Sequence, residues 1–408
     1  MGSSYGALMR VRGFPGLVAS LFLGRVAGQM LSIALILFVL YRYHSPQLAG
    51  LAVFLLTIPG LITSPIAGAL LDRYGRTRLM TVDYLVAAAA LSLMAGLSLR
   101  HLLPPALLLV ICAVASFTGP LSVAGARAMT PSLVPVRMWE RANALDGTAW
   151  LLARILGAPL AGVLVGYVGP EWALAVTAAV FVGAGASISR VLDPAPPQRG
   201  AGIMAEAWSG LVYVLRNRTL SGLALTFFFY SLGWGCLTIA VPVMVLGRFH
   251  QGPAVVGSIW GAVAVAGMVS SLIVGRVRTE GRERQLISGS IAAVAIAMTI
   301  LPFANSVVVV MVALVVVALV ETPWDISFLT LRQRRTDPAR FGRVFAISVS
   351  LNMIGGPVGS ALAGPLIAWS ISGAIWFAVA AVLTAALFPI LVIPGEARLV
   401  NQPAHEEA

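Results

Sequence analysis

The feature that most constrains the fold is a series of apolar stretches, each long enough to cross a lipid bilayer. A membrane-spanning helix needs roughly 20 mainly apolar residues. The 408-residue chain has twelve such stretches, at about 14–41, 48–71, 79–99, 104–126, 142–167, 172–192, 219–247, 254–275, 285–303, 306–330, 343–369 and 373–394. Charged residues make up only 10% of the chain, against about 25% in a typical soluble domain. The pattern predicts an all-α, multi-pass membrane protein with twelve transmembrane helices.

The arginines between these stretches predict the orientation of the chain in the membrane. All 27 basic residues are arginines, against 15 acidic residues. If the N-terminus is cytoplasmic, 22 arginines fall in loops on that side, three fall in the opposite loops and two lie within spans. Positive charge of this kind collects on the cytoplasmic side of membrane proteins. We therefore expect both termini in the cytoplasm, and we interpret the positive charge as topological, without a nucleic-acid partner.

An internal repeat predicts two halves. Residues 120–137 align without a gap on 323–340, and the Gly-x-x-Trp at 169–172 recurs at 373–376. We expect a six-helix bundle at 1–192, a second at 219–395 and a cytoplasmic tail at 396–408. Residues 193–218 would join the bundles as a cytoplasmic linker. Apolar residues at helical spacing in its second part predict an amphipathic helix on the membrane surface.

Few residues are suited to metal or enzyme chemistry. Both cysteines, Cys112 and Cys236, lie inside apolar stretches, and the four histidines are scattered. A zinc site or disulfide framework is therefore not expected. A Walker loop for ATP needs a lysine, which the chain lacks. The sequence predicts no cofactor, no metal and no enzymatic activity.

The loop after the second stretch carries a family resemblance. Residues 68–80 read Gly-Ala-Leu-Leu-Asp-Arg-Tyr-Gly-Arg-Thr-Arg-Leu-Met, and this resembles the signature loop of the major facilitator superfamily. The segment 131–162 and the Arg-Phe-Gly-Arg-Val at 340–344 resemble the enterobactin-exporter-like and multidrug-efflux branch of that family. The resemblance covers nearly the full length and implies two pseudo-symmetric six-helix bundles. The corresponding loop of the second half, at 275–284, departs from the motif, because Arg278 stands where Asp72 would repeat.

The physical roles expected in the signature loop follow from its residue types. Gly68 would let a neighbouring helix approach closely, and Gly75 would permit the tight reversal into the third stretch. Asp72 would accept hydrogen bonds from Arg76 or from a helix N-terminus. The resemblance implies that this helix is the eleventh, near Arg343, so that Asp72, Arg73, Arg76 and Arg343 form a gate or latch. The alternative is that these residues are ordinary topological charges.

A second motif combines glycine and proline within spans. Gly157, Pro159 and Gly162 are echoed by a stretch around Pro357. By resemblance they occupy the place of a glycine–proline motif found in proton antiporters of the family. Small residues also allow close helix packing, and proline allows a bend, whatever the transport mode. The motif fits antiport and plain helix packing equally well.

Ionisable residues inside the spans are the candidate site, because such groups are costly in a membrane. Glu321 is the principal candidate, since Pro323 is expected to disrupt the tenth span beside it and the tenth helix lines the central cavity in the family. A carboxylate there could carry a proton, and Asp325, one helical turn away, is a second candidate. The alternative is that Glu321 forms a structural ion pair with Arg25 or Arg154. Asp83 and Asp146, nearer to span ends, are expected to be structural.

Aromatic residues in the spans could line an apolar pocket, but residues such as Phe227, Tyr230 and Trp324 are expected more often to pack helices or face lipid.

The sequence predicts a secondary transporter in a bacterial plasma membrane. Export of an amphipathic small molecule, driven by protons through alternating access, is the leading hypothesis. Uptake or facilitated diffusion of a small nutrient without proton coupling is the alternative. Under the leading hypothesis the partners are the substrate, protons and the bilayer, and the expected state is a monomer.

Overall fold

The computed structural model describes residues 5–193, 212–214, 216–274, 281–335, 352 and 354–394. The described residues form helices joined by short turns, without strands. In chain order the longer helices are α2 (Phe14–Tyr43), α3 (Pro46–Tyr74), α4 (Arg76–Leu99), α5 (Pro105–Ser116), α6 (Gly119–Leu133), α7 (Trp139–Val168), α8 (Pro170–Ser189), α10 (Arg218–Val243), α11 (Pro253–Val274), α12 (Glu283–Met298), α13 (Val307–Arg334), α15 (Gly355–Trp369) and α16 (Ile371–Leu391). Shorter turns of helix are α1 (Tyr5–Met9), η1 (Val136–Met138), η2 (Met244–Arg248) and η3 (Leu301–Phe303).

Eleven segments within the described residues are long and apolar enough to cross a membrane. They agree with the predicted all-helical, multi-pass organisation. The predicted eleventh span, 343–369, is represented by α15, because residues 343–351 and 353 lie outside the described part of the chain. Most of the predicted linker, residues 194–211, is also outside it, so its amphipathic helix stays a prediction.

Local signals in the sequence explain where several helices begin. Ser45, Ser306 and Ser370 cap α3, α13 and α16, each accepting a hydrogen bond from a backbone N–H three residues later. Gly75 has a φ of 93° and is the single residue between α3 and α4. This left-handed conformation favours glycine, and it gives the tight reversal expected there.

The predicted fourth span differs from the structure in two ways. It is interrupted at Phe117–Thr118, where α5 ends and α6 begins. Helix α6 then continues to Leu133, beyond the predicted end at residue 126. Arg127, which the sequence analysis assigned to a loop, therefore lies within a helix.

The described residues divide into two compact units. The first unit draws on 1–204, 238–265 and 360–369, and the second on 205–237, 266–359 and 370–408. We call α2 to α8, which lie in the first unit, the first bundle, and the parts of α10 to α16 in the second unit the second bundle. The predicted boundaries of the two six-helix halves stay a prediction.

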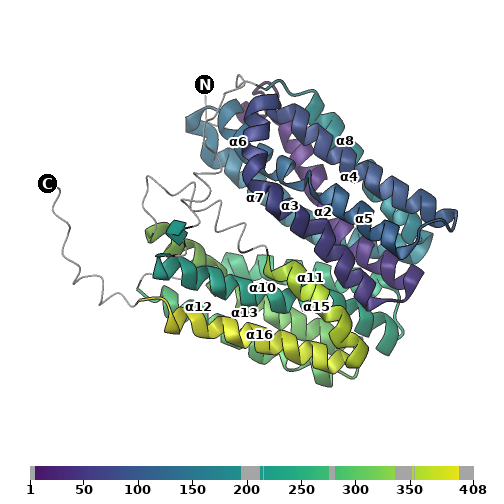
Figure 1. Cartoon of the computed structure of the whole chain (residues 1–408). Helices are drawn as coiled ribbons and strands as arrows, with labels where there is room; N and C mark the ends of the chain where they lie inside the picture. Colours follow the sequence, from purple (N-terminus) through teal and green to yellow (C-terminus); the bar gives the residue numbers. More distant parts are fainter. Residues whose placement is uncertain are drawn as a thin grey trace. The chain divides into compact units, whose positions relative to one another are not determined.

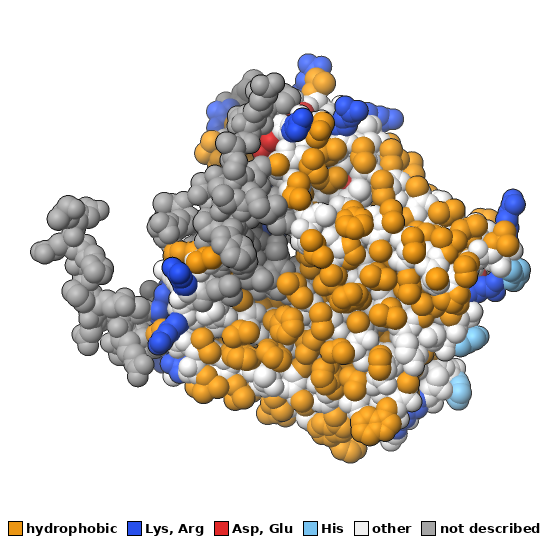
Figure 2. All heavy atoms as spheres, in the orientation of Figure 1, with side chains coloured by type: hydrophobic (Ala, Val, Ile, Leu, Met, Phe, Trp, Pro, Cys, Tyr) orange, Lys and Arg blue, Asp and Glu red, His pale blue; other side chains and the backbone are white. Residues whose placement is uncertain are grey.

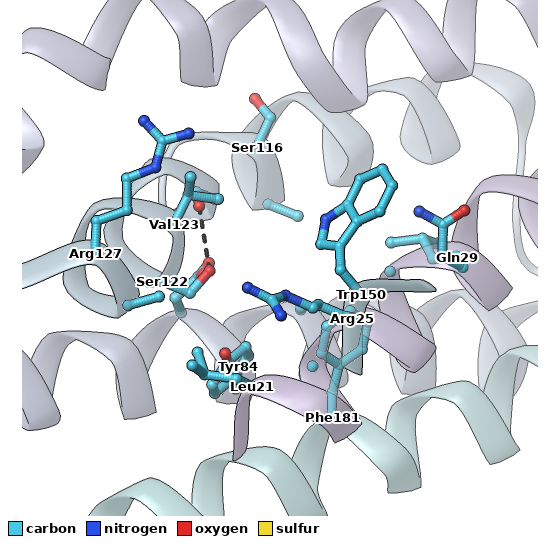
Figure 3. Close-up of a pocket in the computed structure, with 18 of the residues that line it drawn as sticks. Leu21, Arg25, Gln29, Tyr84, Ser116, Ser122, Val123, Arg127, Trp150 and Phe181 are labelled. Carbon is cyan, nitrogen blue, oxygen red and sulfur yellow. Dashed lines mark hydrogen bonds between the residues drawn. The ribbon is translucent and has the colours of Figure 1, made fainter. Parts of the chain in front are cut away.

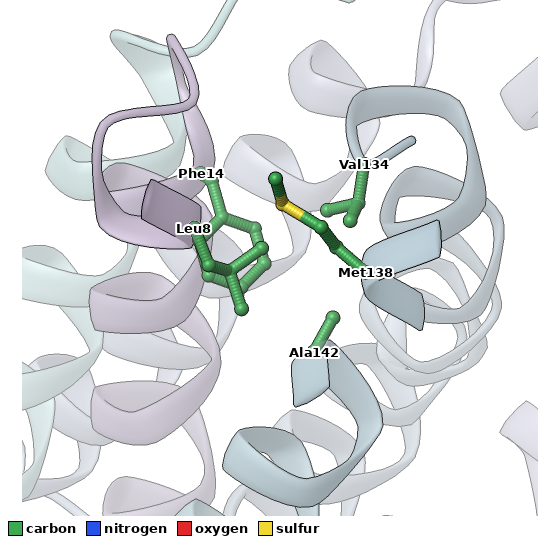
Figure 4. Packing of buried hydrophobic residues seen from close by; sticks show 5 residues of the cluster. All are labelled: Leu8, Phe14, Val134, Met138 and Ala142. Carbon is green, nitrogen blue, oxygen red and sulfur yellow. The ribbon is translucent and has the colours of Figure 1, made fainter. Parts of the chain in front are cut away.

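Within the first bundle, α2 packs against α7 and α8, and α4 packs against α8 (Figure 1). A side chain at Gly157 of α7 would overlap Gln29 of α2, so the helices meet closely there. At one end of this bundle, Leu8, Phe14, Val134, Met138 and Ala142 form a buried apolar cluster (Figure 4). The close contact and the cluster together fix α2 against α7.

The second bundle repeats this use of glycine. Side chains at Gly355 and Gly359 of α15 would overlap the backbone of α10 at Phe228 and Leu232. Close approach of two helices requires small residues at the contact. The Gly157 region and its echo around Pro357 therefore both pack helices closely, which supports the packing interpretation of the glycine–proline motif.

The surface fits a lipid environment. On the face shown in Figure 2, apolar side chains cover most of the area over the helices, and arginines gather towards its margins. The two cysteines are free and buried, Cys112 in α5 and Cys236 in α10.

Candidate functional site

A cavity of about 840 Å³, with polar residues on mainly apolar walls, is lined by the first bundle. Helices α2, α3, α4, α5, α6, α7 and α8 all contribute to its wall (Figure 3). Its polar lining residues are Arg25, Gln29, Asp83, Tyr84, Ser116, Ser122, Arg127, Thr130, Trp139, Asn143, Asp146 and Trp150. A cavity of this size, with a few polar groups on apolar walls, has the dimensions of a small-molecule site.

An ion pair joins two walls of this cavity. Nη2 of Arg25 in α2 lies 2.9 Å from Oδ2 and 2.8 Å from Oδ1 of Asp146 in α7. Nη1 donates a further hydrogen bond of 2.7 Å to the backbone carbonyl of Asp146. The two side chains are 21% and 38% exposed, so both face the cavity while paired. Charge-assisted contacts of this kind are stronger than neutral hydrogen bonds and fix the relative position of two helices.

Asp83 of α4 lines the same cavity in a different environment. The residue is only 5% exposed. Its carboxyl group lies close to the hydroxyl groups of Thr118 and Ser122, at the junction of α5 and α6. No arginine within the described residues is in ion-pair contact with it. Asp83 and Asp146 thus face one cavity with different partners.

Aromatic side chains complete the cavity wall. Trp150 of α7 lies next to Arg25 and Gln29 in Figure 3. On its other side, the guanidinium of Arg154 lies 5.1 Å from the Trp150 ring centre, a cation–π contact. Arg154 is exposed, so it contributes to the site through Trp150. Of the two arginines considered as partners of Glu321, Arg25 is bound to Asp146 and Arg154 lies over Trp150.

Glu321 lies in the second bundle, on α13. It is half-buried, and the hydroxyl of Tyr230 from α10 lies beside its carboxyl group. Asp325 lies one turn further along α13 and is exposed. Contrary to the expected disruption, α13 continues through Pro323 as one helix from Val307 to Arg334. A helix tolerates an internal proline when neighbouring groups satisfy the freed carbonyl.

A cluster of aromatic rings packs beside these acids. Trp324 is 1% exposed, and its ring centre lies 4.7 Å from that of Tyr230 and 5.1 Å from that of Phe328. Phe227 contacts both Trp324 and Phe328 at 5.5 Å. Phe227, Tyr230 and Trp324 therefore pack α10 against α13, which is the more common role expected for them.

In the signature loop, Arg76 bridges several elements. Its guanidinium lies 3.2 Å from Asp72 and 2.6 Å from the hydroxyl of Ser132, and its backbone N–H donates 2.7 Å to Asp193. Arg76 is thus one of the two partners considered for Asp72. Arg343, the other end of the expected latch, lies outside the described residues.

Two further loop residues are less engaged than expected. Gly68 is exposed, and no atom lies within 4 Å of the position that its side chain would occupy. The close helix approach expected at Gly68 is therefore absent among the described residues, and in this part of α3 the buried side chains are those of Ala67 and Leu71. The guanidinium of Arg73 lies 5.3 Å from the ring centre of its neighbour Tyr74.

The cavity of the first bundle was not predicted from the sequence. Asp83 and Asp146 were expected to be structural because both lie near span ends, and Arg127 follows the predicted fourth span. The signal that was available is the series of polar residues Arg25, Gln29, Asp83, Asn143 and Asp146 in or at the ends of apolar stretches. Only the packing of α2, α4 and α7 shows that these residues share one cavity.

Comparison with known proteins is consistent with this architecture. Residues 17–318 and 223–408 match the model of the Major Facilitator Superfamily. An uncharacterized MFS-type transporter, y4rN, of Sinorhizobium fredii is 38% identical over 378 residues, covering 90% of this chain and 92% of the relative. The multidrug efflux pump Tap of Mycobacterium bovis is 27% identical and covers 80% of both chains. The enterobactin exporter EntS of Citrobacter koseri is 26% identical, covering 94% of this chain and 92% of the relative.

A solved structure agrees in fold. The nucleoside transporter NupG aligns with a TM-score of 0.76 over 93% of this chain and 99% of its own, at 10% identity. At that identity the likeness concerns the fold alone. The family model covers most of the chain, and the relatives cover it nearly end to end. The chain therefore belongs to the major facilitator superfamily, whose members are membrane transporters.

Proposed function

We propose that the chain is a proton-driven exporter of an amphipathic small molecule in a bacterial plasma membrane, and that Glu321 carries the proton. The observation that carries this proposal is the position of Glu321. It is a half-buried carboxyl group on an otherwise apolar stretch of α13, with the Tyr230 hydroxyl beside it. An ionisable group at such a place is costly and needs a functional reason.

The environment of Glu321 suits reversible protonation. The Tyr230 hydroxyl lies beside the carboxyl group and makes no hydrogen bond to the described residues, so it is available to donate to the carboxylate or to accept from the carboxylic acid. The rings of Trp324 and its neighbours exclude water from one side of the group. Burial next to apolar groups disfavours a bare charge, and this is the kind of environment that a proton carrier requires. Asp325, exposed and one turn away, would pass protons between Glu321 and water.

Export of an amphipathic molecule is supported by the relatives and by the cavity. Two relatives are an efflux pump and an exporter by name. The cavity of the first bundle combines aromatic walls with an ion pair, which suits a molecule with apolar and polar parts. Alternating access by the predicted halves at 1–192 and 219–395, with a latch from Asp72 to Arg343, is part of the same proposal.

The test is transport into proteoliposomes under an imposed pH gradient. Ethidium, tetracycline and enterobactin serve as probes, and each is followed with and without the gradient. We expect at least one probe to accumulate only when the gradient is present, and Glu321→Gln to abolish that dependence. Glu140→Gln is the matched control, because Glu140 is an exposed residue outside the cavity.

Two outcomes would contradict the proposal. Probe movement that ignores the gradient in the wild-type protein would favour facilitated diffusion. Retention of gradient dependence in Glu321→Gln would remove Glu321 from proton coupling, even if export itself were observed.

A further inference from the structure

The two acids that line the cavity of the first bundle differ in what holds them. Asp146 accepts hydrogen bonds and an ion-pair contact from Arg25. Asp83 is only 5% exposed and lies beside two hydroxyl groups. A guanidinium only donates hydrogen bonds, so it favours the carboxylate. A hydroxyl both donates and accepts, so it satisfies the carboxylate and the carboxylic acid alike.

The charged and titratable groups that face the cavity beside Asp83 come from four helices. From its own helix the neighbouring group is Tyr84; from α2, α6 and α7 the cavity presents Arg25, Arg127 and Asp146. The cavity-lining residues of α3, α5 and α8 are uncharged. Arg25 is engaged with Asp146, and the groups nearest the Asp83 carboxyl are Thr118 and Ser122.

The position of Asp83 also connects it to a break in a helix. Thr118 immediately precedes α6, which begins at Gly119, and Ser122 lies in the first turn of α6. The backbone N–H of Ser122 also lies near the Asp83 carboxyl. A carboxylate is stabilised near a helix N-terminus, and this stabilisation is lost when the group is protonated. Protonation of Asp83 would therefore weaken the contact between α4 and the α5–α6 junction.

We propose that Asp83 is a second proton-binding residue of the transporter, located in the cavity of the first bundle and contacting the α5–α6 junction. The inference rests on the proposed function, because it adds a second proton site to a proton-driven transporter. It assigns a proton to each bundle, one on Asp83 and one on Glu321. The proton comes from hydronium in the water that enters the cavity: one O–H bond of hydronium breaks, an O–H bond forms on a carboxylate oxygen of Asp83, and a water molecule is left.

The test is infrared spectroscopy of the full-length protein in lipid, titrated from mildly acidic to mildly alkaline pH without any substrate. Protonated carboxylic acids have a C=O stretching band that disappears on ionisation. Labelling every aspartate carboxyl with ¹³C shifts aspartate bands and leaves glutamate bands in place. We expect one shifted band, from Asp83, and one unshifted band, from Glu321, in the wild-type protein.

Variants then assign the bands. Asp83→Asn should remove the aspartate band, whereas Asp146→Asn, the matched control in the same cavity, should leave it. Ser122→Ala should move the pH midpoint of the aspartate band, and Asp83→Glu should replace it by an additional unshifted band. If Asp83→Asn does not fold, Asp83→Glu and the label in the wild-type protein still assign the band.

The outcomes separate this inference from the proposed function. An aspartate band that survives Asp83→Asn, or no aspartate band at any pH, would overturn the assignment to Asp83. Absence of the glutamate band in the presence of the aspartate band would overturn the role of Glu321 and leave Asp83 as a proton site.

Discussion

The two bundles hold their buried acids by different means. In the first bundle, Asp146 is paired with Arg25 and Asp83 lies beside hydroxyl groups, around a cavity of about 840 Å³. In the second bundle, Glu321 lies beside Tyr230 and a tightly packed ring cluster. The acids of the first-bundle cavity thus lie beside an arginine and hydroxyl groups, whereas Glu321 of the second bundle lies against packed aromatic rings. The stability of each bundle should accordingly depend on different residues.

The largest effect is expected when the ring cluster of the second bundle is broken. Trp324→Ala removes a side chain that is 1% exposed and contacts three other rings. Loss of a buried aromatic residue of this size costs about 3–5 kcal/mol of unfolding free energy. Thermal unfolding in detergent micelles should show a large drop. Trp369→Ala is the control, because Trp369 is 85% exposed, and a similar drop there would contradict the comparison.

A smaller effect is expected from the ion pair of the first bundle. Arg25→Gln or Asp146→Asn leaves one partner without its charged contact, at a cost of about 1–3 kcal/mol each. The double variant should cost less than the sum of the two, because the second substitution relieves the first. Unfolding of all four proteins gives the coupling energy. Strictly additive effects would show that the pair does not join α2 to α7.

Helix packing in the first bundle can be tested at two glycines of α7. Gly157→Val places atoms where Gln29 lies, so we expect destabilisation of about 1–3 kcal/mol. Gly147→Ala meets no atom within 4 Å and should stabilise the helix by about 0.5–1 kcal/mol. Thermal unfolding should therefore move in opposite directions for the two variants. Equal shifts would mean that α2 and α7 are not in close contact at Gly157.

The smallest change in stability is expected for Tyr230→Phe. This substitution should instead change the pH dependence of transport. Tyr230→Phe keeps the ring in its cluster and removes the hydroxyl beside Glu321. The pH profile of gradient-driven ethidium transport should shift, while the melting temperature changes little. Tyr43→Phe is the control, because its hydroxyl donates 2.7 Å to the carbonyl of Leu103, away from these acids. If the pH profile of Tyr230→Phe were unshifted, the Tyr230 hydroxyl would have no role in proton coupling.

Much of the fold was predictable, because bilayer crossing requires long apolar stretches that are visible in any single sequence. The Gly75 turn and the serine caps depend on the backbone preferences of a few neighbouring residues, so they too can be predicted from the sequence. The α5–α6 break was not predicted, because residues 104–126 are apolar enough on average to read as one span and hydropathy does not report a local interruption of a helix. The extension of α6 to Leu133 was not predicted either, because the helix continues beyond the end of the apolar stretch.

The candidate site was only partly predictable. Glu321 and Asp325 stand out because they interrupt an apolar stretch, and so does Arg25. The partner of Arg25 could not be chosen from sequence, because Asp146, Glu321 and other acids were equally available along the chain. Pairing depends on which helices are neighbours, and the contact of α2 with α7 decides it. The same packing explains why Asp83 lines a cavity although its position suggested a structural role.

The concealed thiols of Cys112 and Cys236 have a practical consequence. They are the two cysteines of the whole sequence, one in α5 and one in α10, and both are buried within helices. Spin labels or fluorophores attached to newly introduced surface cysteines should therefore react without prior removal of the native ones. Pairs of such labels, one on α4 and one on α12, would let resonance or dye-transfer measurements follow the separation of the bundles through a transport cycle in an otherwise unaltered protein.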